Sequence, residues 1–291
     1  MPNKMTVLIT GCAGMIGSSL SIELLNKGYS IIGIDRKKCN FTNENFIQIV
    51  CELYDFEKLA NVFDNYKIDR VIHLAALAHT SGEKDLSYNR YFDINVNCSK
   101  NIFNIAAKHH IPVLFASTVD VYGFVDGIVT NETIPSPVTI YGKTKYLAEC
   151  ELKNISANTS LNYTIFRFAP VYSKDIKRDI QKRYYLKYPH IAYVVGKGTE
   201  YEVLSIENAI KNMIEWIENI PQNKICNIKD PTRLNTAECI ENEIANGKAK
   251  IVIHFPRWLV FSGFNIIKFL IGKNKYTYLL NKVVNPLITK E

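Results

Sequence analysis

The start of the chain holds a glycine-rich turn between an apolar run and a helical pattern. Val7 to Ile9 form a short apolar run that is typical of a buried strand. Gly11, Gly14 and Gly17 follow it, and the residues after them have the apolar period of a helix. The first glycine permits a tight turn, the second lets the backbone approach a pyrophosphate, and the third lets helix and strand pack closely. This order predicts a phosphate site at the N-terminus of a helix.

A second apolar run supports a dinucleotide site. The predicted strand from Ser30 to Ile34 ends at Asp35, about 20 residues after the turn, where an acid can bind the hydroxyls of an adenosine ribose. The glycine spacing is G-x-x-G-x-x-G rather than G-x-G-x-x-G, so the turn alone also fits an ordinary strand-to-helix connection. The turn, helix, strand and terminal acid in register favour dinucleotide binding.

The first half of the chain alternates apolar strand runs with helical patterns. This alternation predicts an α/β fold with a doubly wound parallel sheet of the Rossmann type. In such sheets ligands bind at the carboxyl ends of the strands, where Ala75, Thr118 and the loop after Arg167 fall. The second half is less regular, so we predict a dinucleotide-binding domain over 1–170 and a smaller, interleaved substrate-binding region over 171–291. Strands are predicted near 6–10, 30–34, 46–50, 70–75, 112–117 and 162–167, and helices near 14–27, 55–65, 93–109 and 140–154.

Three polar residues of this half form a candidate catalytic set. Tyr141 and Lys145 are four positions apart and share one face of a predicted helix. An ammonium beside a phenol favours the phenolate and lowers the tyrosine pKa, so Tyr141 can transfer a proton near neutral pH. Thr118, at the end of a predicted strand, can hydrogen-bond a reacting hydroxyl or carbonyl. A strand-end hydroxyl that caps a turn is the structural alternative for Thr118, and the three residues together favour catalysis.

These residues resemble the extended short-chain dehydrogenase/reductase family, in its nucleotide-sugar epimerase/dehydratase branch. The resemblance is good up to Pro170 and loose beyond it. It implies that Tyr141 is the catalytic acid/base and that Thr118 aligns the reacting group. It also implies that Lys145 holds the nicotinamide ribose, that the cofactor is NAD and that the substrate is a nucleotide-diphosphate sugar.

The same resemblance extends to the cofactor-binding residues. The stretch NVNCSKN from Asn95 to Asn101 matches the family's Asn-Val-x-Gly-Thr-x-Asn helix, with Cys98 and Ser99 in place of Gly and Thr. Asp35 would repel the 2′-phosphate of NADP, which favours NAD, while Arg36 and the lysines after it leave NADP as an alternative. The predicted cofactor-binding residues are Gly11, Gly14, Met15, Ile16, Gly17, Asp35, Arg36, Glu52, Leu53, Ala75, Ala76, Ala78, Asn95, Tyr141 and Lys145.

The resemblance leaves the reaction open. An epimerase acting at C4 through a transient 4-keto sugar is the leading hypothesis. A reductase of a nucleotide 4-keto-6-deoxy sugar is the alternative, favoured by the divergent C-terminal half. Asp120 stands where dehydratases and decarboxylases of the branch often carry an acid, and it is either a second acid/base or a structural residue. Val119 replaces the aspartate of sugar dehydratases, which disfavours that reaction, and the intact catalytic set disfavours a non-catalytic dinucleotide-binding protein.

Cysteine and histidine usage predicts a chain without a metal site. The seven cysteines contain no C-x-x-C pair, and their odd number favours reduced thiols in a cytoplasmic protein. Met1 to Lys4 run directly into the first strand, without the pattern of a signal peptide. His73 and His79 flank a strand end, but no metal-ligand set accompanies them, so we expect structural roles.

The net charge of +7 lies wholly in the last part of the chain. Residues 247–291 hold eight basic residues and one acid, Glu291, and the rest of the sequence balances to zero. A nucleic-acid protein with a basic face spread over its fold is not indicated. The segment 255–273 is apolar but too interrupted to predict a membrane span. We favour a packing helix there over a basic amphipathic helix on an anionic membrane. From the family we expect a homodimer through the helices at 93–109 and 140–154.

Overall fold

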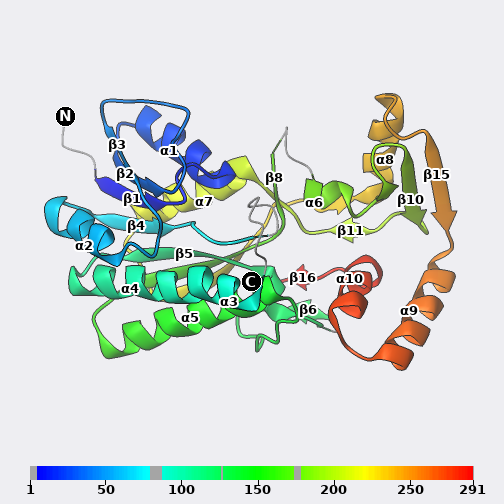
Figure 1. Cartoon of the computed structure of the whole chain (residues 1–291). Helices are drawn as coiled ribbons and strands as arrows, with labels where there is room; N and C mark the ends of the chain where they lie inside the picture. The colour runs from blue at the N-terminus through cyan, green and yellow to red at the C-terminus, as the bar shows by residue number, and fades with distance from the viewer. Residues whose placement is uncertain (1–4, 79–86, 126, 174–177, 291) are drawn as a thin grey trace. The chain divides into compact units, whose positions relative to one another are not determined.

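The structure is a computed structural model that describes residues 5–78, 87–125, 127–173 and 178–290 (Figure 1). Its contacts divide the chain into two compact units, each built from several stretches of sequence. The first, called unit 1, comprises Met1–Thr118, Ile140–Arg167 and Ala209–Cys226. The second, called unit 2, comprises Val119–Thr139, Phe168–Asn208 and Asn227–Glu291.

A seven-stranded sheet forms the centre of unit 1. Its strand order is β13-β7-β5-β4-β1-β2-β3, and the pairs that join β3, β2, β1, β4 and β5 are parallel. The chain order reverses between β1 and β4, which is the switch point where ligands bind in open α/β sheets. The strands are β1 (Thr6–Thr10), β2 (Ser30–Asp35), β3 (Phe46–Val50), β4 (Arg70–His73), β5 (Val113–Thr118), β7 (Tyr163–Phe168) and β13 (Lys224–Ile228).

Helices cover both faces of this sheet, which explains why its central strands are almost continuously apolar. The helices α2, α4 and α5 bury their apolar sides against one face, and α1 and α7 lie on the other (Figure 1). Asp55 begins α2 by accepting a hydrogen bond from the Lys58 amide. The bounds are α1 (Met15–Asn26), α2 (Phe56–Asn65), α4 (Ser99–Lys108), α5 (Ile140–Asn158) and α7 (Ile206–Glu218).

The α/β fold and the parallel sheet predicted from the sequence are confirmed, with small differences at the element ends. The predicted strand over 70–75 ends at His73, and the helix predicted over 93–109 begins earlier. That helix has three parts, which are α3 (Tyr88–Phe92), the π-helical η1 (Asp93–Cys98) and α4. π-Helical turns often lie at functional sites because they redirect side chains.

Unit 2 contains short strands and three longer helices. Its largest sheet is β15-β10-β9, in which β10 is parallel to β15 and antiparallel to β9. Two-stranded pairs join β11 to β14, β12 to β8 and β16 to β6. The elements are η2 (Val119–Tyr122, a 3₁₀ turn), β6 (Ile128–Val129), β8 (Val171–Tyr172), α6 (Arg178–Gln181), β9 (Tyr185–Lys187), β10 (Ile191–Val195), β11 (Glu200–Tyr201), β12 (Leu204–Ser205), β14 (Leu234–Asn235), α8 (Thr236–Ala245), β15 (Ile251–Phe255), α9 (Arg257–Ile271), α10 (Lys275–Val284) and β16 (Ile288–Thr289).

The end of the chain is held within unit 2 by a buried carboxylate. Glu202 accepts hydrogen bonds from the Thr289 amide and hydroxyl at 2.9 and 2.8 Å, and from Lys229 Nζ at 2.6 Å. These contacts fix β16 beside β6. None of the helices in the described part of the chain has both the length and the apolar character needed to cross a bilayer.

Candidate active site

The glycine turn has the close approaches that its sequence predicts. Gly11 has φ +76°, and a Cβ atom there would lie 2.9 Å from the Ala75 amide nitrogen. At Gly17 a Cβ would lie 2.1 Å from the Gly11 carbonyl oxygen, so α1 packs on the turn only with glycine at that position. Gly14 is the N-cap of α1 and makes no side-chain hydrogen bond to the first amides of the helix. The amides that open α1 are therefore positioned for a phosphate group, with the positive end of the helix dipole behind them.

Asp35 is fixed beside this turn at the end of β2. Its Oδ2 accepts from the Ala13 amide at 3.0 Å and its Oδ1 accepts from the Lys37 amide at 2.9 Å. These hydrogen bonds orient the carboxylate at the carboxyl edge of the sheet, where an adenosine ribose is held in dinucleotide folds. Arg36 follows it and is exposed. The glycine turn, the first amides of α1 and the Asp35 carboxylate thus fit a dinucleotide. The contacts of these residues with a ligand remain a prediction.

The segment after β4 is held by Asn95. The Asn95 Oδ1 accepts from the Leu77 amide at 2.6 Å, while its Nδ2 donates to the Leu77 carbonyl at 3.0 Å and to Thr144 Oγ1 at 3.1 Å. Asn95 is fully buried in η1, so the amide links the Ala75–Ala78 segment to α5. We infer that Asn95 positions that segment, while half-buried Ala75, Ala76 and Ala78 form its surface.

Glu52 and Leu53 lie in the connection after β3. Leu53 is half-buried and packs against the core of unit 1. Glu52 is also half-buried. Both stay predicted cofactor-binding residues.

His73 is a buried structural residue at the end of β4. Its Nδ1 is 2.6 Å from Thr10 Oγ1 and its Nε2 is 2.8 Å from Ser99 Oγ, and its ring stacks on Phe115. Burial, assisted by the charge of Lys145, lowers the pKa of His73 to about 3, so the ring is neutral at physiological pH. His79 lies outside the described residues. Among the residues that the structure describes, no group of histidine, cysteine and acidic side chains could hold a metal ion.

The predicted acid/base pair lies in the first two turns of α5. Tyr141 is half-buried and Lys145 is 1% exposed, one turn later on the same face. The Lys145 Nζ is 4.0 Å from the centre of the Phe115 ring in β5. Burial lowers the pKa of Lys145 to about 7, and the negative charge of Glu149 opposes that shift. Lys145 can therefore change its protonation state near neutral pH, as an acid/base site requires.

Sequence inspection missed Glu149, which continues the same helical face after Tyr141 and Lys145. Its Oε1 accepts from Ser117 Oγ at 2.5 Å and from Arg167 Nε at 3.1 Å, and its Oε2 accepts from Arg167 Nη2 at 2.6 Å. Glu149 and Arg167 are 0% and 1% exposed, so this is a buried, bidentate ion pair. The i,i+4 continuation of the helix face and an arginine inside an apolar strand are the signals that could have found it.

This ion pair fixes α5 to β5 and β7 at their carboxyl ends. Ser117 directly precedes Thr118, the last residue of β5. The contacts of Glu149 with Ser117 and of Lys145 with Phe115 hold the helix that carries Tyr141 against the strand that ends in Thr118. Thr118, Tyr141 and Lys145 thus belong to one unit and are supported by one buried network.

Asp120 has a different environment, within unit 2. Its Oδ1 accepts from Tyr278 OH at 2.8 Å and from Lys282 Nζ at 2.5 Å, and its Oδ2 accepts from the Thr139 hydroxyl. Burial alone would raise its pKa, but the charge of Lys282 and the three hydrogen bonds outweigh burial and lower the pKa of Asp120. An ionised carboxylate bound by three donors is a poor proton donor at neutral pH. We therefore propose that Asp120 fixes α10, rather than acting as a second acid.

Replacing Asp120 by Asn is expected to lower the free energy of unfolding at pH 7 by about 1–3 kcal/mol, since Lys282 loses its partner while staying partly solvated. The Asp120 pKa in the folded chain lies below the unfolded value of about 3.9. Its stabilisation is therefore present above that unfolded pKa and is lost as the pH falls through the folded pKa. Urea unfolding of both proteins should show a difference at pH 7 that shrinks towards pH 3. An equal stability at pH 7 would contradict this role.

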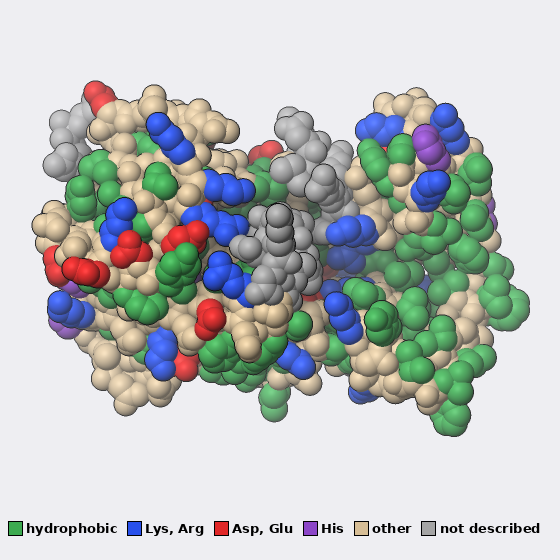
Figure 2. Space-filling view, in the orientation of Figure 1, with side chains coloured by type: hydrophobic (Ala, Val, Ile, Leu, Met, Phe, Trp, Pro, Cys, Tyr) green, Lys and Arg blue, Asp and Glu red, His purple; other side chains and the backbone are tan. Residues whose placement is uncertain are grey.

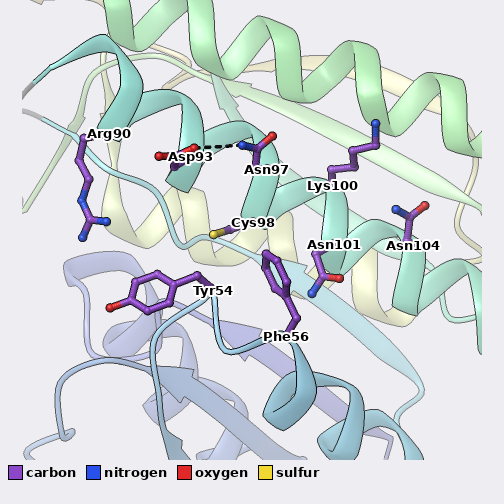
Figure 3. Close-up of a pocket in the computed structure, with 9 residues that line it drawn as sticks. All are labelled: Tyr54, Phe56, Arg90, Asp93, Asn97, Cys98, Lys100, Asn101 and Asn104. Carbon is purple, nitrogen blue, oxygen red and sulfur yellow. Dashed lines mark hydrogen bonds between the residues drawn. The ribbon is translucent and has the colours of Figure 1, made fainter.

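A hollow of about 660 Å³ lies in unit 1, and neither Tyr141 nor Lys145 belongs to its lining (Figure 3). Tyr54 and Phe56 precede and begin α2, and Asn101 of α4 points towards Phe56, whereas Lys100 and Asn104 point away from both rings (Figure 3). Asn97 donates to Asp93 at 3.0 Å along its rim, and Arg90 lies 6.0 Å from the Tyr54 ring centre. Its lining is Tyr54, Phe56, Arg90, Asp93, Asn97, Cys98, Lys100, Asn101 and Asn104. The surface of the helix predicted to dimerise is thus largely polar here, and the homodimer stays a prediction.

The predicted site residues described above also lie in the part of the chain that matches a known protein family. The model of the NAD dependent epimerase/dehydratase family matches residues 7–228, which include the glycine turn, Thr118, Tyr141 and Lys145. The chain belongs to this family. It is an NAD-dependent epimerase/dehydratase family enzyme, and the predicted resemblance and cofactor are confirmed at the level of the family.

Proteins similar to this chain include sugar-nucleotide 4-epimerases. The bifunctional protein gal10 of Schizosaccharomyces pombe is 34% identical over 57% of this chain and 26% of its own length. The UDP-glucose 4-epimerase of Caenorhabditis elegans is 30% identical over 56% of this chain and 53% of its own length. The chain thus spans about half the length of these curated relatives, or less. UDP-glucuronic acid 4-epimerase from Bacillus cereus, solved with NAD, superposes with a TM-score of 0.71 over 87% of both chains at 22% identity, which shows a shared fold.

Proposed function

We propose that this enzyme epimerises a nucleoside-diphosphate sugar at C4. The observation that carries the proposal is the Tyr141–Lys145 face of α5, in which a buried lysine with a pKa of about 7 follows the tyrosine by one turn. The glycine turn and Asp35, which form the predicted dinucleotide site, lie in the same unit. Relatives of this chain include UDP-glucose 4-epimerases, which supports C4 as the reacting carbon.

The residues divide the chemistry as follows. Gly11, Gly14 and Asp35 would hold NAD, which would supply reversible hydride transfer at the sugar carbon. Tyr141, as phenolate, takes the proton of the 4-hydroxyl and returns it when the hydroxyl forms again. Thr118 donates a hydrogen bond to the oxygen that becomes a carbonyl, so this oxygen stays aligned with Tyr141.

Lys145 supports the proton transfer through its charge. A protonated Lys145 stabilises the Tyr141 phenolate, while burial keeps the lysine pKa near neutrality. Glu149 opposes the effect of burial on Lys145, so the buried ion pair also helps to keep the ammonium charged. The buried contacts of Glu149 with Ser117 and Arg167 thus stabilise unit 1, and the Glu149 charge also helps to keep Lys145 protonated beside Tyr141.

The decisive experiment follows sugar interconversion by NMR with UDP-glucose, UDP-N-acetylglucosamine and UDP-glucuronic acid, without added reductant. Mass spectrometry of denatured protein measures the NAD that each preparation retains. We expect retained NAD and reversible formation of the C4 epimer of at least one sugar. Stoichiometric oxidation of NADH or NADPH with a 4-keto sugar, and no interconversion, would instead favour the reductase alternative.

A further inference from the structure

The C-terminal helices carry apolar side chains on the outside as well as the inside. Among the fifteen residues of α9 only Phe264 is buried. Phe269 is 88% exposed, Leu270 71%, Trp258 69% and Ile266 60%. The adjoining α10 exposes further apolar side chains, and Figure 2 shows hydrophobic atoms gathered over these helices. We call this surface the α9–α10 apolar face and define it by Trp258, Leu259, Ile266, Phe269, Leu270, Tyr276, Leu279 and Leu280.

This arrangement is unusual for a helix on the outside of a water-soluble unit. Phe264, with the half-buried Val260 and Phe261, already supplies the stripe that packs inward. Trp258, Ile266, Phe269 and Leu270 lie outside that stripe. A helix that is apolar all round normally has cover on both sides, and contiguous exposed apolar surface marks a docking site.

The sequence segment that carries the apolar face is rich in basic residues and has no acidic residue before Glu291. Lys248, Lys250, Arg257, Lys273 and Lys275 are exposed, and the sequence from Gly247 to Lys290 contains no aspartate or glutamate. The basic excess of the whole chain therefore lies in the same segment as the exposed apolar side chains of α9. A partner that binds this face must therefore offer apolar atoms to cover the exposed side chains and negative charge to pair with the basic residues.

We propose that the α9–α10 apolar face docks on the surface of an anionic lipid bilayer. Acyl chains would cover Phe269, Leu270 and Ile266, while headgroup phosphates would pair with exposed Arg257, Lys273 and Lys275 at the ends of these helices. Exposed Trp258 and Tyr276 are aromatic residues of the kind that is enriched at membrane interfaces. This inference does not depend on the proposed epimerase reaction.

The geometry favours attachment to one leaflet. At about 1.5 Å per residue, the fifteen residues of α9 are shorter than the roughly 30 Å of a hydrocarbon core. The helix would therefore lie in the plane of the interface. A second copy of the chain is a poorer occupant, because a two-fold contact through this face would bring its basic residues against one another.

Flotation of the 291-residue chain with vesicles tests the proposal. The probes are vesicles of phosphatidylcholine alone and vesicles that contain phosphatidylglycerol, each at low and high salt. We expect flotation with the anionic vesicles at low salt, at least tenfold weaker flotation with phosphatidylcholine alone, and a decrease in high salt. A chain that stays in the soluble fraction with anionic vesicles at low salt would overturn the proposal.

Two sets of variants separate docking from nonspecific adhesion. W258S/F269S/L270S removes apolar side chains of the face, and K273E/K275E with K250E reverses charge in the basic segment that carries it. Each should reduce flotation at least tenfold. The matched controls are I134S/I220S, at side chains that are 84% and 87% exposed elsewhere, and K67E/K211E/K224E, at exposed lysines outside the face. Both controls should float like the parent chain.

Two further outcomes would contradict lipid docking. Controls that lose flotation as strongly as the face variants would show nonspecific charge or apolar adhesion. Light scattering that shows a dimer for the parent chain and a monomer for W258S/F269S/L270S would assign the face to a second copy. Circular dichroism and urea unfolding of each variant verify that it is folded, so that a loss of flotation reports on the surface.

Discussion

Replacing Tyr141 by Phe is expected to lower turnover by about 10²- to 10⁴-fold, the range that a positioned acid/base group contributes. The substitution removes one hydroxyl from the face of α5 that also holds Lys145, and it leaves the ring in place. Retained dinucleotide and the free energy of unfolding should therefore change little. The measurement is the initial rate of sugar interconversion, together with the NAD content of the purified variant.

Tyr146→Phe is the matched control for this experiment. Tyr146 lies in the same helix, is also half-buried, and carries the same hydroxyl on a different face. We expect turnover within about twofold of the parent, because Tyr146 has no part in the proposed proton transfer. Similar rates for Tyr141→Phe and the parent chain would refute the role of Tyr141 as the acid/base.

The largest expected effect on stability comes from Glu149→Gln. The substitution leaves the Arg167 guanidinium, which is 1% exposed, without its compensating charge. Removing one partner of a buried ion pair typically destabilises by about 3–5 kcal/mol, and we expect a loss of that size in urea unfolding. Lys145 should also lose a charge that opposes the effect of burial, so its pKa falls further below its ordinary value.

Glu151→Gln is the control for this loss. Glu151 lies two residues later in α5 and pairs with Lys100 at 2.9 Å, but both side chains are partly solvated. Exposed pairs contribute about 0–1 kcal/mol, so this variant should be nearly as stable as the parent. Equal losses for the two variants would show that burial of the Glu149–Arg167 pair has no special effect.

A double variant keeps the test informative if Glu149→Gln does not fold. Replacing both partners, as E149L/R167M, removes the uncompensated charge and fills similar volume with apolar atoms. Such exchanges are often neutral or stabilising, so the double variant should recover much of the loss.

Both Glu149→Gln and E149L/R167M remove the negative charge of Glu149, so Lys145 should lose its proton at a lower pH than in the parent chain. The fall of activity at alkaline pH should therefore begin at a lower pH in these variants. A merely structural pair would leave that pH profile unchanged.

Local sequence patterns were sufficient to predict the first half of the fold. The glycine turn, Asp35 and the alternating apolar runs specify their own geometry, since each depends on neighbours within a few residues. The structure confirms the strands around β1 and the close contacts of Gly11 and Gly17. Helix spacing likewise placed Tyr141 and Lys145 on one face of α5.

The roles of several polar residues required contacts between distant parts of the chain. Asp120 has Tyr278 and Lys282 as partners, which are more than 150 positions later in the sequence. The two amide atoms of Asn95 are engaged by Leu77 and Thr144. A spacing pattern shows which side chains are present but not which hydrogen-bond donors contact them. It could therefore not distinguish a catalytic acid at Asp120 from a residue that fixes α10.

The sequence by itself determined the fold class, the family's dinucleotide turn and the candidate acid/base pair of this protein. Those features follow from the backbone freedom of glycine and from the periodic spacing of side chains along a strand or a helix. Both depend only on residues that are close in the sequence. Only the tertiary structure decided which charges are buried together and which apolar residues stay exposed. Burial makes the Glu149–Arg167 pair a determinant of stability, and the absence of burial makes the apolar side chains of α9 a surface. Both depend on packing between segments far apart in the chain, where solvent is excluded or admitted.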